Sequence, residues 1–153
     1  MSNTQFAFLK RANVPTREAW QGAIDALNFS VRFELDPELE PFEDEGFSPC
    51  KIDGSDHDVG FEIFYEPTED IIEEDDDPLK EFVDDARDYC ISMVWRGSMQ
   101  DCAAVMIASC ALVKLSDAVV SCDGEAPDSF DKLVEDTKEM IVEALKERDV
   151  AAS

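Results

Sequence analysis

Residues 89–115 read YCISMVWRGSMQDCAAVMIASCALVKL and contain the two most apolar elements of the chain. The first seven residues are apolar on both faces apart from Ser92, which predicts a central strand of a sheet. From about Met99 to Leu115 the side chains are apolar nearly all round a helix, so this helix is expected to be deeply buried. The rest of the chain supplies the strands and helices that surround these two elements.

Further elements are predicted on both sides of this stretch. Thr16 is a helix N-cap, followed by an apolar stripe at helical spacing that includes Trp20 and Ile24. A last helix is expected at about residues 129–148. Alternation of apolar and polar residues, or short apolar runs between turn signals, predicts strands at residues 5–9, 29–35, 47–52, 60–65 and 118–122. Acidic, proline-containing loops are predicted at residues 36–46 and 66–77.

The resulting order is β-α-β-β-β-β-α-β-α. It predicts a single α+β domain spanning residues 1–153, in which a largely antiparallel sheet of about five strands packs against about three helices. A hydrophobic fraction of 44 % indicates that the chain folds in spite of its charge.

The acidic residues are concentrated in one part of the chain. Residues 33–79 hold nineteen acids and a single base, Lys51, so this segment carries −18 of the net charge of −24. Such a field attracts basic proteins and repels nucleic acid and anionic membranes. We therefore predict a basic protein partner, with no nucleic acid and no membrane bound.

The N-terminus lacks a basic region followed by an apolar run, so no targeting signal is expected and the protein is predicted to be cytoplasmic. Its five cysteines have no CxxC pair and lie mostly in apolar runs, as reduced buried thiols do. With one histidine in the chain, structural zinc is rejected.

Catalytic and metal sites are not indicated either. The carboxylates around His57 do not have EF-hand spacing, because Pro67 stands where the bidentate glutamate belongs. An acidic turn would keep His57 protonated, which is the wrong state for a general base, and Cys90 is more simply a core residue. No glycine-rich phosphate loop is present. The prediction is a non-enzymatic protein with no cofactor and no metal.

Aromatic residues are interleaved with the acids, which is typical of an interface for a basic partner. The alternative is a solvated surface that serves solubility. The predicted partner-binding residues are Glu34, Glu38, Glu40, Phe42, Glu43, Asp44, Glu45, Phe47, Asp56, Asp58, Glu62, Phe64, Glu66, Glu69, Asp70, Glu73 and Glu74.

Three stretches, VPTREAWQ (residues 14–21), GFSPC (46–50) and GFEIFY (60–65), together with the alanine-rich helix, resemble small acidic bacterial proteins of unassigned activity. Some of these are similar to immunity proteins encoded beside secreted toxins. The resemblance implies a bacterial protein that neutralises a toxin and names no catalytic residue.

The leading hypothesis is thus a bacterial immunity or inhibitor protein that binds a basic partner, a toxin or a secreted effector, through residues 34–77. A second hypothesis is an acidic chaperone for a secreted effector, which would be a homodimer with an apolar groove, so the oligomeric state, monomer or homodimer, stays open. A third is a DNA mimic, which would need carboxylates in ordered rows.

Overall fold

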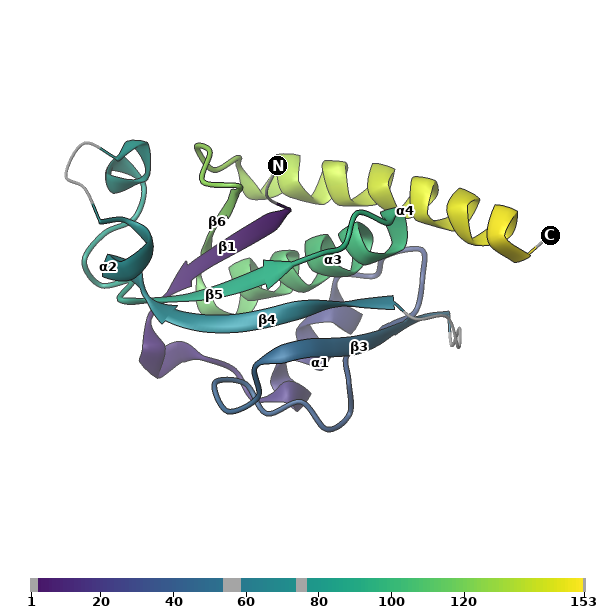
Figure 1. The fold of residues 1–153 in the computed structure, drawn as a ribbon, viewed down its shortest axis with the longest axis horizontal. Helices are drawn as coiled ribbons and strands as arrows, with labels where there is room; N and C mark the ends of the chain where they lie inside the picture. Colours follow the sequence, from purple (N-terminus) through teal and green to yellow (C-terminus); the bar gives the residue numbers. More distant parts are fainter. Residues whose placement is uncertain (1–2, 54–58, 74–76, 153) are drawn as a thin grey trace.

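The computed structural model describes residues 3–53, 59–73 and 77–152, with side chains described as far as Val150. The predicted α+β architecture is confirmed (Figure 1). The elements in chain order are β1 (Thr4–Leu9), η1 (Arg11–Asn13), α1 (Arg17–Ala26), β2 (Phe33–Glu34), β3 (Gly46–Ile52), β4 (Val59–Pro67), α2 (Thr68–Ile71), η2 (Pro78–Glu81), β5 (Tyr89–Val94), α3 (Met99–Ser116), β6 (Val119–Cys122) and α4 (Phe130–Ala152), where η marks a turn of 3₁₀ helix.

Within the described residues, six strands form one antiparallel sheet in the order β2-β3-β4-β5-β1-β6. The prediction of about five strands is close to this number, and the order of elements along the chain, which contains six strands, is as predicted apart from the short helix α2 and the two 3₁₀ turns. β5 lies inside the sheet, with Ile91 paired to Tyr65 of β4 on one side and to Ala7 of β1 on the other. The prediction of a central strand at this position is confirmed.

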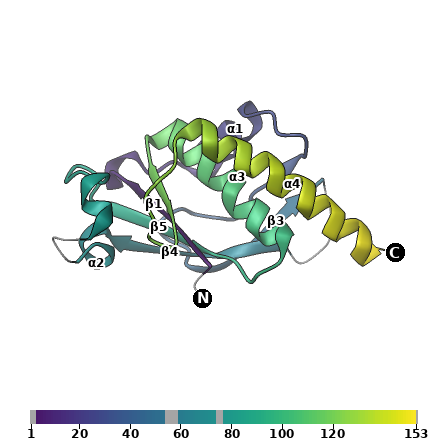
Figure 2. The ribbon, with the colours of Figure 1, turned by 90° about the horizontal axis from the view of Figure 1, so that it is seen from above.

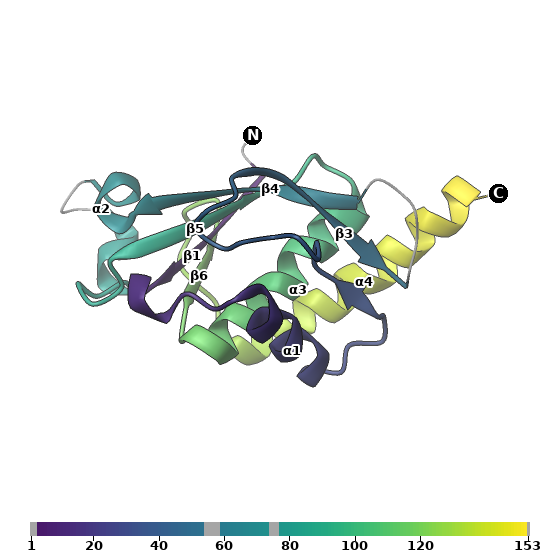
Figure 3. The ribbon, with the colours of Figure 1, turned by 90° about the horizontal axis from the view of Figure 1, so that it is seen from below.

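The helix α3 lies between the sheet and α1, with α4 packed alongside (Figures 2 and 3). Its residues 103–112 are buried apart from the partly buried Met106, as its apolar circumference predicts. Trp20 of α1 is fully buried and donates a hydrogen bond from Nε1 to the carbonyl oxygen of Ala108 at 3.1 Å. In length and composition α3 would also suit a membrane span, but 67 % of it is buried inside the protein, as in the core helix of a folded domain.

The sheet has an apolar cluster on each face. The main core lies on the helix side and includes Ala7, Phe61, Ile63 and Ile91. The opposite face, here called the outer face, is turned towards the viewer in Figure 1. A smaller cluster covers one end of the outer face, where Phe8 and Cys90 of the strands pack with Ile72, Leu79 and Val83 of the α2–η2 segment.

Residues 66–77 do not form a loop throughout, because β4 continues to Pro67 and one helical turn, α2, follows. Two contacts hold this turn: the Thr68 amide donates to the carbonyl oxygen of Asp88 at 2.9 Å, and Thr68 Oγ1 donates to that of Arg87 at 2.6 Å. Ile72 is buried in the smaller cluster directly after it. These anchors outweigh the repulsion among neighbouring carboxylates that favoured a loop.

The strand predicted at residues 29–35 is reduced to Phe33 and Glu34, although the predicted burial of Val31, Phe33 and Leu35 is correct. β3 ends at Ile52, and Asp53 follows with φ of +55°. The Asp53 amide still donates to the Arg32 carbonyl oxygen at 2.7 Å, but the Arg32 amide donates to Oδ1 of Asp53 at 2.8 Å instead of to a backbone carbonyl, so the regular ladder stops at Phe33. The far edge of β2 is covered by a side chain of α1. Gln21 donates from Nε2 to the Phe33 carbonyl oxygen and accepts from the Leu35 amide, both at 2.8 Å, as a neighbouring strand would do.

Two glycines provide a test of the close approach of β3 and β4. A Cβ on Gly60 would lie 2.3 Å from the carbonyl oxygen of Ser48, whereas a Cβ on Gly22, inside the exposed face of α1, would meet nothing within 4 Å. We expect Gly60→Ala to lower the free energy of unfolding by about 1–3 kcal/mol through overpacking. Gly22→Ala should raise it by about 0.5–1 kcal/mol through helix propensity. Urea denaturation measures both, and an unchanged stability of Gly60→Ala would contradict the packing described.

Candidate functional site

The pleat of β4 brings three of the predicted binding residues to the outer face. Phe61 and Ile63 point to the helix-side core, so Glu62, Phe64 and Glu66 point the other way. Glu62 is paired in register with Phe47 of β3 on one side and with Val94 of β5 on the other. Phe47 therefore shares the outer face with Glu62, Phe64 and Glu66, and these four residues are here called the outer-face patch.

The outer-face patch combines accessible aromatic surface with carboxylates. The Phe47 side chain is 43 % exposed, Phe64 and Glu62 are half-buried, and Glu66 is exposed. The α2–η2 segment packs on the outer face at Phe8 and Cys90, and Cys90 is the register partner of Glu66 at one end of the patch. The sequence pattern alone gives the alternation along β4, and the register with β3 is needed to add Phe47.

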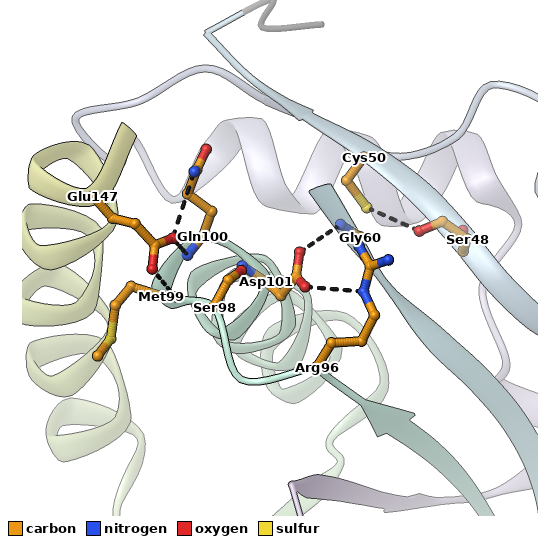
Figure 4. Close-up of polar contacts among 9 residues, drawn as sticks. All are labelled: Ser48, Cys50, Gly60, Arg96, Ser98, Met99, Gln100, Asp101 and Glu147. Carbon is orange, nitrogen blue, oxygen red and sulfur yellow. Dashed lines mark hydrogen bonds and ion pairs between the residues drawn. The ribbon is translucent and has the colours of Figure 1, made fainter. Parts of the chain in front are cut away.

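Phe47 is held in place by groups that the sequence did not point to. The Arg96 guanidinium lies over the Phe47 ring, 4.7 Å from its centroid. Nε of Arg96 donates to Oδ2 of Asp101 at 3.3 Å, and Oδ1 of Asp101 accepts from the Gly60 amide at 3.0 Å (Figure 4). Asp101 is 2 % exposed, so a buried carboxylate in the first turn of α3 fixes the position of a surface arginine and its aromatic neighbour.

The acidic residues of the loop at residues 35–45 lie apart from the outer-face patch. Phe42 packs on the helix side of the sheet, with its ring centroid 4.3 Å from that of Tyr65 and 5.1 Å from that of Tyr89. Arg11 lies 4.1 Å from the Phe42 centroid and covers the other side. Phe42 thus anchors its own loop, and the acids that stand exposed around it are Glu38, Glu40, Glu43, Asp44 and Glu45.

The remaining predicted residues that the structure describes occupy two further places. Glu69, Asp70 and Glu73 are exposed on and just after α2, next to the covered end of the outer face. Glu34 forms an ion pair with Arg32 at 3.2 Å on β2, at the far edge of the sheet. Asp56, Asp58 and Glu74 lie outside the described residues. The described members of the predicted set are therefore divided among separate surfaces.

The cysteines are protected from ionisation by their surroundings. Burial raises the pKa of Cys90 to about 12 and that of Cys102 and Cys110 to about 11, and it also raises the pKa of Cys50 and Cys122. A nucleophilic cysteine needs a lowered pKa. In the part of the chain that the structure describes, no group of three or more His, Cys, Asp or Glu side chains is arranged to hold a metal ion. His57 lies outside that part.

No protein-family model matches the chain, and no curated protein or solved structure shows significant similarity to it.

A second carboxylate at the start of α3 was also not anticipated. Glu147 of α4 accepts from the amide of Met99 at 3.0 Å and from that of Gln100 at 3.1 Å, so it caps α3 from a neighbouring helix (Figure 4). Partial burial tends to raise the pKa of Glu147, but these hydrogen bonds lower it below its ordinary value of 4.5. This contact ties α4 to the helix that carries Asp101.

The Glu147 cap predicts a defined pH dependence. Because the folded-state pKa is depressed, its stabilisation is complete above about pH 4.5 and is lost as pH falls through the folded-state pKa. Glu147→Gln should lower the free energy of unfolding by about 1 kcal/mol at pH 7, and the difference from the wild type should shrink towards pH 3.

Glu143→Gln is the matched control for urea denaturation across this range, since Glu143 is exposed one turn away on α4 and contacts Lys146 at 3.5 Å. We expect it to change stability by less than about 0.5 kcal/mol. A difference between Glu147→Gln and the wild type that is as large at pH 3 as at pH 7 would refute the capping role.

Proposed function

We propose that this protein is a non-enzymatic bacterial immunity or inhibitor protein, which neutralises a basic protein partner such as a toxin by binding it at the outer-face patch. The observation that carries the proposal is an exposed, positioned aromatic ring beside carboxylates. Phe47 is 43 % exposed, Arg96 holds it in place, and Glu62 is its direct neighbour in the sheet. Rigid aromatic and arginine side chains contribute most of the free energy at many protein interfaces.

The charge around the outer-face patch supports a partner of opposite sign. Glu62 and Glu66 belong to the patch, and Glu69, Asp70 and Glu73 are exposed beyond its far end. The whole chain carries a net charge of −24, which would accelerate encounter with a cationic surface at low salt. In this arrangement the carboxylates set the association rate, and Phe47 with Phe64 supplies contact area that slows dissociation.

The exposed acids of the loop at residues 35–45 have a different part in this proposal. Phe42 holds that loop against the helix side of the sheet, so its carboxylates lie away from the outer-face patch. They add to the long-range field without touching a partner bound at the patch. Their neutralisation is then expected to slow association and to leave the dissociation rate nearly unchanged.

The partner is found by capture on the immobilised protein from the native host at low salt, followed by mass spectrometry. A captured protein is accepted only if it is basic, is lost with a Phe47→Ala variant and is inactivated by the wild-type protein. A basic partner whose binding is competed by duplex DNA would favour the DNA-mimic alternative. A secreted partner that is delivered intact and not inhibited would favour the chaperone alternative.

The binding kinetics with that partner test the division between charge and contact. Glu62→Gln with Glu66→Gln should slow association several-fold at about 50 mM salt and have little effect at about 1 M, where charges are screened. Phe47→Ala should instead raise the dissociation rate by about tenfold or more. Surface plasmon resonance measures both rates.

The matched controls lie on α4. Glu135→Gln with Glu139→Gln removes two exposed charges, and Val142→Ala truncates an apolar side chain that is 50 % exposed. The α4 charge pair should slow association less than the outer-face pair, and Val142→Ala should leave both rates unchanged. Binding that is equally tight at low and high salt would show that electrostatic steering is the wrong account.

A further inference from the structure

The edge strand β6 presents backbone groups that no strand of the described residues covers. The Asp123 amide donates to the carbonyl oxygen of Thr4 at 2.8 Å, and the register pairs Phe6 with Ser121 and Phe8 with Val119. Hydrogen-bonded pairs alternate along an antiparallel ladder. The amide and carbonyl of Val120 therefore point away from β1, towards the open edge of the sheet.

The two edge strands of the sheet differ in whether their outward backbone groups are hydrogen-bonded. At the β2 edge, the Gln21 side chain of α1 donates to the Phe33 carbonyl oxygen and accepts from the Leu35 amide, so a side chain closes this edge. At the β6 edge, no hydrogen bond from a described residue occupies the outward groups of Val120. Open edges accept further strands, and proteins commonly protect them unless they are used.

An apolar groove of about 340 Å³ runs along this open edge. Val119 packs with the cluster of the outer face and Val120 with the main core, so the groove borders both faces of the sheet at β6. An extended segment beside β6 would place alternate side chains on these two sides. The residues lining the groove are Phe82, Val113, Ala118, Val119, Val120, Pro127, Asp128, Ser129, Phe130 and Leu133.

The surroundings of the groove are acidic. Residues 117–131 contain five acids and no lysine or arginine. The nearby cations are engaged: Arg87 is paired with Asp84 and Asp117, and Lys114 lies over the ring of Phe130 at 5.0 Å. This part of the chain lies outside the segment at residues 33–79 that holds most of the acids, so it is a second acidic region with its own apolar surface.

We propose that the β6 edge binds an extended, lysine- or arginine-containing segment of a partner protein, which adds to the sheet as a seventh strand. The backbone of Val120 supplies the pairing groups, the groove receives apolar side chains, and the acidic surroundings select basic ones. A second copy of this chain is disfavoured as the occupant, because each copy carries a charge of −24 and would bring its own five acids to the contact. The proposal does not depend on the outer-face patch binding anything.

The test uses a blocked, fluorescent peptide of about eight residues in which valine alternates with lysine, the pattern of a strand added at an edge. On saturation of the full-length protein we expect hydrogen exchange at the Val120 amide to slow by about tenfold or more, because that amide becomes paired. NMR measures the exchange, and fluorescence anisotropy measures the dissociation constant. Phe82→Ala, which truncates a groove residue that is 41 % exposed, should raise that constant about fivefold.

Four controls, two protein variants and two altered peptides, separate the possible causes of peptide binding. Val142→Ala and Phe47→Ala should leave peptide affinity unchanged, so failure of the proposed function at the outer-face patch and failure at this edge are distinguishable. A peptide with methylated backbone nitrogens keeps its charges but cannot pair, and it should bind much more weakly. A peptide with glutamate in place of lysine should also bind more weakly.

Equal binding of the methylated peptide would overturn strand addition, and equal binding of the glutamate peptide would overturn selection by charge. Protection of Val120 that rises with protein concentration in the absence of peptide would assign the edge to a second copy and would likewise overturn the proposal. Analytical ultracentrifugation of the protein alone provides that check.

Discussion

The structure depends on the burial of α3, a helix that is apolar nearly all round. Burial on every side stabilises such a helix, because all of its faces are apolar. The sheet, α1 and α4 each cover a part of its surface. The few polar groups that it takes into the interior must each find a hydrogen bond there. Ser109 Oγ accepts from Nε2 of Gln5 on β1 at 3.1 Å, and Asp101 binds Gly60 and Arg96. These bonds fix how α3 lies against the strands.

The packing of α3 on the sheet restricts where carboxylates can lie. One face of the sheet is occupied by α3, so carboxylates must lie on the outer face, in the connections between strands or along the edges. Asp101 joins the interior to that surface, because the carboxylate that anchors α3 to Gly60 also holds Arg96 over Phe47. A buried residue that joins α3 to β4 therefore also positions the most exposed aromatic ring of the outer-face patch.

Much of the fold was predictable because the signals are local. The apolar runs specified β5 and α3, and the Thr16 hydroxyl caps α1 by accepting from the Ala19 amide at 3.1 Å, as expected. The failures concern contacts between distant residues. The length of β2 is set by where β3 turns at Asp53, and α2 forms because Thr68 reaches Asp88. Neither partner is visible in the local pattern.

In the candidate site, too, local sequence predicted some features, and contacts between distant residues determined the others. Alternation along β4 placed Glu62, Phe64 and Glu66 on one face, whereas Phe42, equally aromatic and equally surrounded by acids, is stacked on Tyr65 at the other face. Composition cannot separate these two cases, since only the strand register and the course of the loop do so. Gln21 is the clearest example: in the sequence it is an ordinary residue on a helix, and in the fold its amide closes one edge of the sheet. Among the described residues, none closes the corresponding edge at β6 in this way, and this difference between the edges arises from tertiary structure alone.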